Sequence, residues 1–304
     1  MTKTQQLFQE DIFDAVIIGN IAKEINIDEF GDTGSREGGA IVYAASSCSS
    51  NNAKIAVTTK LAKEDFELIK PLHAKHADIY YKFNGNTAII QNKLSNKIHV
   101  DTTCINQGSP FQICDIPDVK SYYYLFVNDF YGEISLDLIN YYSHYGKIAL
   151  DASCFVRRIN PSTKLITNSD YHHKKYLASL CDIFKLTMDQ AKILTGESDT
   201  QRACEIIKSW GANEVLITEN KILHLLDENN VFHSIHIPEF CGNEYLYTDA
   251  TAFAIYVTQR ITSDPETSLL CAAAVTMCKL QRPGPAKCKR AEINLNLDTY
   301  FYHK

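Results

Sequence analysis

Short apolar runs alternate with longer segments of helical spacing along most of this 304-residue chain. Apolar runs of about four to eight residues between turn residues are typical of buried strands, whereas apolar positions repeated at three and four residues are typical of helices. The short runs predict strands at residues 15–20, 54–59, 123–127, 147–151, 182–186 and 214–218. The longer segments predict helices at residues 40–49, 64–73, 135–145, 172–179, 188–194, 201–210, 250–261 and 266–281. Strands that alternate with helices predict an α/β fold with a mainly parallel sheet covered on both faces.

A two-residue period replaces this pattern after the second predicted strand. Residues 87–91 and 98–102 flank a turn-like segment at 95–97, which predicts a β-hairpin. A hairpin fits poorly inside a parallel sheet, and residues 21–37 are too polar for a core, so both regions are predicted to form a small β lid. The predicted α/β core comprises residues 1–20, 38–78 and 115–304, and the predicted lid comprises residues 21–37 and 79–114.

The last third of the chain adds a strand pair and a tail. Residues 222–226 and 231–237 predict two short strands. In the tail, Ile293, Leu295 and Leu297 alternate with Asn and Asp, and this two-residue period predicts an extended edge segment.

The composition is that of an ordinary globular protein, with 45% hydrophobic and 22% charged residues. The formal net charge of −6 and the lack of Lys and Arg clusters argue against a nucleic-acid-binding surface. No apolar run reaches the length that crosses a bilayer, and the first residues lack the pattern of a secretory signal. We therefore expect a cytoplasmic protein with neither a membrane nor a nucleic-acid partner.

The ten cysteines form no Cys-x-x-Cys pair, and most of them lie in apolar segments. Cys271 and Cys278, for example, lie in the helix predicted at residues 266–281. Zinc sites and disulfide frameworks usually show characteristic spacings. The cysteines are therefore interpreted as small buried hydrophobic residues of a reducing compartment.

Three stretches in a fixed order carry a resemblance to a known family. The first is a strand, a polar lid segment and the glycine pair at 38–39 that opens a helix. The second is residues 181–196, which end in Leu-Thr-Gly, and the third runs from residues 215–218 through Asp249 to the Arg-Pro-Gly at 282–284. Together they resemble the ribokinase-like (PfkB) carbohydrate kinases over nearly the whole chain. The resemblance implies a three-layer α/β/α ribokinase-like fold with a mainly parallel sheet, a small β lid and ligands at the carboxyl ends of the strands.

The signature of this family is Asp-Thr-Thr-Gly-Ala-Gly-Asp before a helix, and its last Asp acts as general base toward the acceptor hydroxyl. Counted back without gaps from the Arg-Pro-Gly, this base falls on Asp249. Asn243 then replaces the first Asp, and Leu246-Tyr247-Thr248 replaces Gly-Ala-Gly. Glycine admits positive φ and close approach to a phosphate, whereas Leu and Tyr resist both. The resemblance thus implies phosphate-binding positions at Asn243 and Thr248, in a loop that forms the usual anion cradle poorly.

Two alternatives for Asp249 remain open from the sequence. A second alignment matches residues 241–245 to a Cys-Gly-Asp-Thr-Tyr pattern and puts Asn243 at the base position, but it breaks the spacing to Arg282. An aspartate directly before an apolar helix is also a common N-cap, which stabilises by about 1 kcal/mol. Capping and catalysis are compatible, because one carboxylate can cap a helix and face a ligand.

Other positions of the family pattern are altered as well. The Asn-x-x-Glu motif, whose carboxylate helps to organise Mg²⁺ through water, reads Thr187-Met-Asp-Gln190. A neutral amide weakens any site for a hard cation, so the implied contribution of Gln190 to a Mg²⁺ site is weak. The resemblance also implies nucleotide or phosphate contacts at Thr187 and at Thr218, which precedes the turn at residues 219–221.

The implied sugar-binding positions are Glu24, Gly38 and Gly39. Glu24 is assigned by its position alone, and the two glycines form the turn through which the family admits a sugar. A flexible turn at the start of a helix is the alternative interpretation of the glycines. Arg157 and Arg158 are interpreted either as phosphate contacts or as solvated surface.

The resemblance implies an ATP- and Mg²⁺-dependent phosphotransferase that acts on a hydroxyl of a sugar, nucleoside or polyol, with a lid that excludes water. The lost glycines and the missing Glu motivate an alternative, a catalytically impaired relative that binds a sugar-like or nucleotide ligand as a sensor or scaffold. Pairing of the lid hairpins of two copies would give a homodimer under either function.

Overall fold

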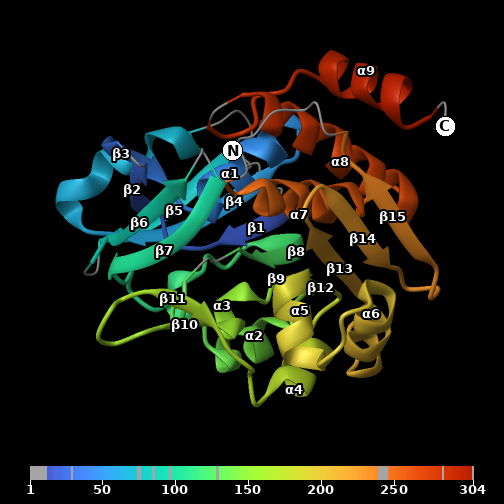
Figure 1. Ribbon diagram of the computed structural model, residues 1–304, viewed down its shortest axis with the longest axis horizontal. Helices are drawn as coiled ribbons and strands as arrows, with labels where there is room; N and C mark the ends of the chain where they lie inside the picture. Colours follow the sequence, from blue (N-terminus) through green and yellow to red (C-terminus); the bar gives the residue numbers. More distant parts are fainter. Residues whose placement is uncertain are drawn as a thin grey trace, which may run out of the picture.

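The computed structural model describes residues 12–28, 30–73, 77–83, 86–95, 98–127, 130–238, 246–282 and 284–302. Its centre is a nine-stranded sheet in the order β15-β14-β13-β12-β9-β8-β1-β4-β5 (Figure 1). The strands from β13 to β5 pair in parallel, whereas β14 and β15 pair antiparallel. The strands are β1 (Ile12–Ile18), β4 (Ile55–Leu61), β5 (Ala77–Phe83), β8 (Lys120–Phe126), β9 (Lys147–Asp151), β12 (Ile183–Thr187), β13 (Glu214–Glu219), β14 (Ile222–Leu226) and β15 (Phe232–His236).

Helices cover both faces of this sheet, and a separate apolar core fills the space under each helical layer. One face carries α1 (Ala40–Ser50), α7 (Thr248–Gln259) and α8 (Pro265–Gln281), with α9 (Arg290–Tyr300) packed outside α8 (Figure 1). The other face carries α2 (Leu136–Tyr142), α3 (Ser153–Val156), α4 (Lys174–Ser179), α5 (Met188–Thr195) and α6 (Thr200–Ser209). Two 3₁₀ segments are Lys63–Leu72 and Ile113–Asp115. The predicted three-layer α/β/α arrangement is confirmed.

A second, four-stranded sheet lies beside the central sheet (Figure 1), and we call it the lid. Its strands, in the order β3-β2-β6-β7, are β2 (Ala22–Asp28), β3 (Gly31–Gly38), β6 (Ala88–Ser95) and β7 (Ile98–Asn106). The predicted hairpin is the antiparallel pair of β6 and β7. A short hairpin of β10 (Arg157–Ile159) and β11 (Ile166–Asn168) adjoins β7 through a bridge between Thr103 and Leu165.

The predicted lid boundary at residue 79 is wrong by one strand. Residues 79–83 belong to β5, which pairs in parallel with β4 and forms an edge of the central sheet. As an edge strand, β5 buries little of its surface, and Tyr80, Tyr81 and Phe83 are 36–44% exposed. Its mixed pattern therefore resembles that of a lid strand rather than that of a buried one.

The tail forms helix α9 and not the predicted extended edge. Ile293 and Leu297 are buried, with 0% and 7% exposed, whereas Leu295 is 64% exposed. Buried positions four residues apart share one face of a helix, so the apolar period of the tail is helical. The Asn296 side chain donates a hydrogen bond of 3.1 Å to the Ala274 carbonyl and thereby joins α9 to α8.

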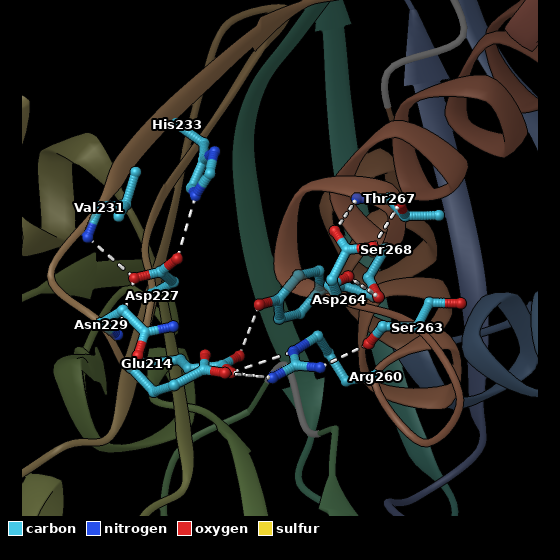
Figure 2. A network of polar contacts seen from close by, with 12 residues as sticks. Glu214, Asp227, Asn229, Val231, His233, Arg260, Ser263, Asp264, Thr267 and Ser268 are labelled. Carbon is cyan, nitrogen blue, oxygen red and sulfur yellow. Dashed lines mark hydrogen bonds and ion pairs between the residues drawn. The ribbon is translucent and has the colours of Figure 1, made fainter.

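A buried polar network fastens α7 to the central sheet (Figure 2). Glu214 on β13 accepts hydrogen bonds from the Tyr256 hydroxyl at 2.5 Å and from the Arg260 guanidinium at 2.8 and 3.0 Å. Arg260 also pairs with Glu228 at 3.0 Å. Burial raises the pKa of Glu214 although Arg260 acts to lower it. The network holds in place the helix whose first turn carries Asp249.

Nine cysteines within the described residues are free thiols, and eight of them are buried, as the sequence predicts. Cys241 lies outside the described residues. No three His, Cys, Asp or Glu side chains among the described residues gather in a way that could hold a metal ion. In the same residues, no helix combines the length and the apolar character that a membrane span requires.

Candidate active site

A cavity of about 620 Å³ lies at the carboxyl edge of the central sheet, between the strand ends and the lid. The lid contributes Asn92 and Thr102, strands β12 and β13 contribute Thr187 and Thr218, and α7 contributes Asp249. Open α/β sheets bind their ligands at this edge, and a volume of this size suits a small organic ligand. The cavity is therefore the candidate active site.

Asp249 lies in the first turn of α7 and lines the cavity, with 28% of its side chain exposed. The N-cap of α7 is Tyr247, so the alternative role of Asp249 as N-cap is wrong. Its Oδ2 forms an ion pair with Nζ of Lys185. Burial acts to raise the pKa of Asp249, but the charge and hydrogen bond of Lys185, the charge of Arg157 and the Ala250 N–H together lower it. Asp249 is therefore an ionised carboxylate that is open to the cavity.

Lys185 is a fully buried lysine of β12 that joins two carboxylates. Its Nζ contacts Asp249 and lies 2.8 Å from Oδ2 of Asp151, the last residue of β9. Burial acts to lower the pKa of Lys185, but the two carboxylates outweigh that effect and raise it. The Ser153 hydroxyl and N–H lie 2.6 and 3.1 Å from Oδ1 of Asp151. We call Asp151, Lys185 and Asp249 the buried triad, and of the three only Asp249 lines the cavity.

Tyr247, directly before α7, has a left-handed backbone with φ 57° and ψ 23°. A Cβ makes this conformation costly, by about 1–2 kcal/mol, whereas glycine adopts it freely. Tyr247 nevertheless adopts positive φ, against the preference that the sequence analysis expects of a residue with a Cβ. Its ring packs on Tyr43 of α1, with the two ring centroids 4.6 Å apart. Packing thus holds a conformation that the residue itself disfavours, and Leu246, Tyr247 and Thr248 all line the cavity.

Gln190 is 1% exposed and is engaged inside the protein. Its Oε1 accepts a hydrogen bond of 3.1 Å from the Thr187 N–H, while Thr187 Oγ1 accepts one of 3.4 Å from the Gln190 N–H. The same Oε1 lies 3.0 Å from the Ser153 hydroxyl. These residues form a capping box at the start of α5. A neutral oxygen with these partners does not fit the predicted contribution of Gln190 to a Mg²⁺ site.

No family model and no curated protein sequence matches this chain. The structure is similar to that of a pyrophosphate-dependent kinase in the ribokinase family complexed with a pyrophosphate analog and myo-inositol. That similarity has a TM-score of 0.84 and 24% identity, and covers 92% of this chain and 99% of the other. Arabidopsis thaliana ribokinase complexed with ribose and ATP is similar with a TM-score of 0.72 and 14% identity, over 94% of this chain and 99% of the other. The chain has the ribokinase fold.

Within this ribokinase fold, several predicted phosphate and nucleotide positions come together. Thr187, Thr218 and Thr248 line one cavity with Asp249, although up to 62 residues separate them in the sequence. Asn243 lies outside the described residues. The second alignment, which would make Asn243 the base, covers residues 241–245, and these also lie outside the described residues. The spacing from the Arg-Pro-Gly therefore predicts a residue, Asp249, whose carboxylate lines the cavity.

The sugar-binding positions that the resemblance implies for this chain do not line this cavity. Glu24 is fully buried in the lid, and its Oε1 accepts a hydrogen bond of 2.7 Å from the Gly39 N–H. Gly39 has φ 91° at the start of α1, and a Cβ added to Gly38 would lie 1.9 Å from Glu24 Oε1. The geometry supports the alternative interpretation of the two glycines, a tight turn at the start of a helix.

Sequence reasoning misses Lys185 and Asp151 as members of the site. A lysine inside an otherwise apolar strand signals a buried ion pair, because an unpaired buried charge is costly. Its partners, however, are 34 and 64 residues away, so the sequence does not identify them. Of the two arginines with open roles, Arg157 lines the cavity, whereas the Arg158 guanidinium lies 4.4 Å from the ring centroid of Tyr131.

Proposed function

We propose that this protein is a phosphotransferase that moves a phosphoryl group from a phosphoanhydride donor to a hydroxyl of a sugar, nucleoside or polyol. The observation that carries the proposal is the Asp249 carboxylate, ionised beside Lys185 and open to the cavity in the first turn of α7. Asp249 accepts the proton of the acceptor hydroxyl while the oxygen attacks the terminal phosphorus of the donor. The bond from that phosphorus to its bridging oxygen breaks, and the leaving group departs with the electron pair. The start of α7 favours the negative charge of the phosphates.

Polar, uncharged side chains of the lid support an acceptor with several hydroxyl groups. Asn92 is 2% exposed, and its side-chain amide donates a hydrogen bond of 3.1 Å to Asn26 Oδ1. Its Oδ1 accepts one of 2.9 Å from the Thr102 hydroxyl. Asn92 and Thr102 both line the cavity, so an amide and a hydroxyl that hydrogen bonds hold in place form part of its wall. Groups of this kind select for hydroxyl partners, and the similar solved structures contain myo-inositol and ribose.

Two donors are consistent with the fold. The sequence resemblance implies ATP, and the ribokinase structure from Arabidopsis thaliana is complexed with ATP. The pyrophosphate-dependent kinase, whose TM-score is higher, is complexed with a pyrophosphate analog. Either donor carries phosphates that bind Mg²⁺ directly, so Mg²⁺ belongs in the assay although Gln190 does not fit a metal site.

The test is the formation of a phosphate monoester, followed by ³¹P NMR. The full chain is incubated with Mg²⁺, with ATP or pyrophosphate, and with a panel of sugars, nucleosides and inositols. Asp249→Asn is expected to lower kcat by about 10²–10⁴-fold, because the general base is lost. The matched control is Asp170→Asn, at a surface carboxylate that is 56% exposed and pairs with Lys174, and its turnover is expected to equal that of the wild type. The proposal fails if no donor and acceptor pair gives an ester, or if Asp249→Asn retains the turnover.

A second candidate function is the binding of a sugar-like or nucleotide ligand without turnover. It is favoured by the amide of Gln190, whose Oε1 is engaged with the Thr187 N–H and the Ser153 hydroxyl. It predicts that calorimetry detects binding of an acceptor from the same panel while ³¹P NMR detects no ester. An ester formed from any pair excludes it.

A further inference from the structure

Tyr247 stands where the family pattern has Ala, and its ring makes aromatic contacts that Ala lacks. Its ring packs on Tyr43 at a centroid distance of 4.6 Å and an interplanar angle of 32°. Tyr43 is 1% exposed, and the buried Nζ of Lys279 on α8 lies 5.4 Å from its ring centroid. The three side chains come from the turn before α7, from α1 and from α8. Tyr247 is therefore packed against α1, through a ring that itself lies beside Lys279 of α8.

Tyr247 also packs on a small apolar cluster to which the lid contributes. We call this cluster the lid core, and Ile166 packs against it as well. Its buried residues are Ala22 of β2, Ala88 and Ile90 of β6, and Phe130 of the segment between β8 and α2. One side chain thus packs on the lid core and on the core of the central domain, directly beside the cavity.

The backbone of Tyr247 sets the direction in which α7 begins. Its carbonyl accepts a hydrogen bond of 3.1 Å from the Thr251 N–H, which closes the first turn of the helix. Its φ of 57° lies in the left-handed region, which a residue with a Cβ keeps only when its surroundings hold it there. Thr248 and Asp249 follow at once, and both line the cavity. A change in the conformation of Tyr247 would therefore move both residues.

We propose that Tyr247 is a positioning residue. Its ring, held between Tyr43 and the lid core, keeps the turn before Asp249 in the left-handed conformation and couples that turn to the lid. The packing supplies what the backbone freedom of a glycine would supply at this position. The inference rests on the proposed function, because this turn places Asp249 and the start of α7 beside the donor phosphates.

The test compares Tyr247→Phe, Tyr247→Gly and Tyr247→Ala in the full chain, with kcat, KM for the donor and the thermal midpoint measured for each. Phe keeps the ring and is expected to match the wild type. Ala removes the ring and keeps a Cβ, so kcat/KM is expected to fall by about 10²-fold through misplacement of the base. Gly removes the ring and restores backbone freedom, so its kcat/KM is expected to lie between those of Ala and the wild type. If Tyr247→Ala does not fold, Tyr247→Leu takes its place as the variant that keeps a Cβ without a ring.

A residue that only stabilises the fold would lower the thermal midpoint and leave kcat of the folded variants unchanged, and that result overturns the proposal. An Ala variant as active as the wild type also overturns it, because the ring then contributes nothing.

Calorimetric titration with methylenediphosphonate, an analogue of pyrophosphate, separates this inference from the proposed function. Its Kd is expected to follow the same order, tightest for the wild type and Phe and weakest for Ala. If no ester forms but this order holds, the proposed function fails and the inference stands. A wild type that does not bind the diphosphonate, or variants with equal Kd, overturn the inference.

Discussion

Replacement of Lys185 by Met is expected to destabilise the protein strongly, because it leaves a buried charge without its partner. Lys185 is fully buried, and Asp151 is 1% exposed. The Ser153 hydroxyl and N–H still reach Asp151 after the replacement, but no cation does. Removal of one partner of a buried ion pair typically costs about 3–5 kcal/mol. Met has a similar length and no charge, so the change tests the charge rather than the volume.

The expected shift of the thermal midpoint follows from the size of the chain. An unfolding entropy of about 2.1 cal/mol/K per residue, over 304 residues, amounts to about 0.6 kcal/mol for each degree. A loss of about 3–5 kcal/mol therefore lowers Tm by about 5–8 °C. Differential scanning calorimetry of the wild type and of Lys185→Met at pH 7 measures this shift.

Two further variants decide whether the buried charge is the cause. Lys185→Met combined with Asp151→Asn removes the uncompensated charge, so this double variant is expected to be more stable than Lys185→Met alone. Lys70→Met is the matched surface control, because Lys70 pairs with Glu67 and the two side chains are 71% and 70% exposed. A surface pair contributes about 0–1 kcal/mol, so the Tm of Lys70→Met is expected to fall by less than about 2 °C. Equal shifts for Lys70→Met and Lys185→Met, or a double variant less stable than Lys185→Met, would refute the reasoning.

Two more predictions concern carboxylates outside the cavity. Burial acts to raise the pKa of Asp115, but hydrogen bonds from Lys60, from the Gln112 N–H and from Lys82 lower it. The stability gained from Asp115 is thus present above the unfolded pKa and is lost as the pH falls through the folded pKa. The Tm difference between the wild type and Asp115→Asn is therefore expected to be largest near pH 6–7 and to shrink below about pH 4, and a difference that is constant with pH would contradict this. Gly38→Ala is expected to displace the Glu24 carboxylate and to cost about 1–3 kcal/mol in urea unfolding, and an unchanged midpoint would show that the carboxylate moves freely.

Apolar runs predict the central sheet well because its strands are buried between two helical layers. Strand β12 is an example, since four of its five residues are buried. The same reasoning fails where a segment is short and exposed on one side. The tail has apolar residues at alternate positions, but only Ile293 and Leu297 are buried, and the helix follows from this pair rather than from Leu295. Apolar residues at alternate positions over five residues do not distinguish a strand from a helix. Residues four apart lie on one face in both.

The candidate site was predictable where it depends on spacing and unpredictable where it depends on long-range pairing. The number of residues between Asp249 and the Arg-Pro-Gly at 282–284 predicts Asp249 as the base, and this spacing can be read from the sequence. The buried triad instead joins β9, β12 and α7, which meet only through the order of strands in the sheet. The sequence shows that Lys185 is an anomaly in an apolar strand, but only the fold shows that its charge holds the Asp249 carboxylate in place.

Tyr247 shows that the loss of the family glycines at Leu246 and Thr248 does not by itself predict the backbone of this turn. Glycine provides a left-handed turn through its own backbone, so its presence in a sequence predicts the turn directly. A tyrosine provides the same turn only when other residues hold it, and here Tyr43 and the lid core do so. Those residues are distant in the sequence and carry no motif. The left-handed turn before Asp249 is therefore held by packing that no sequence motif signals.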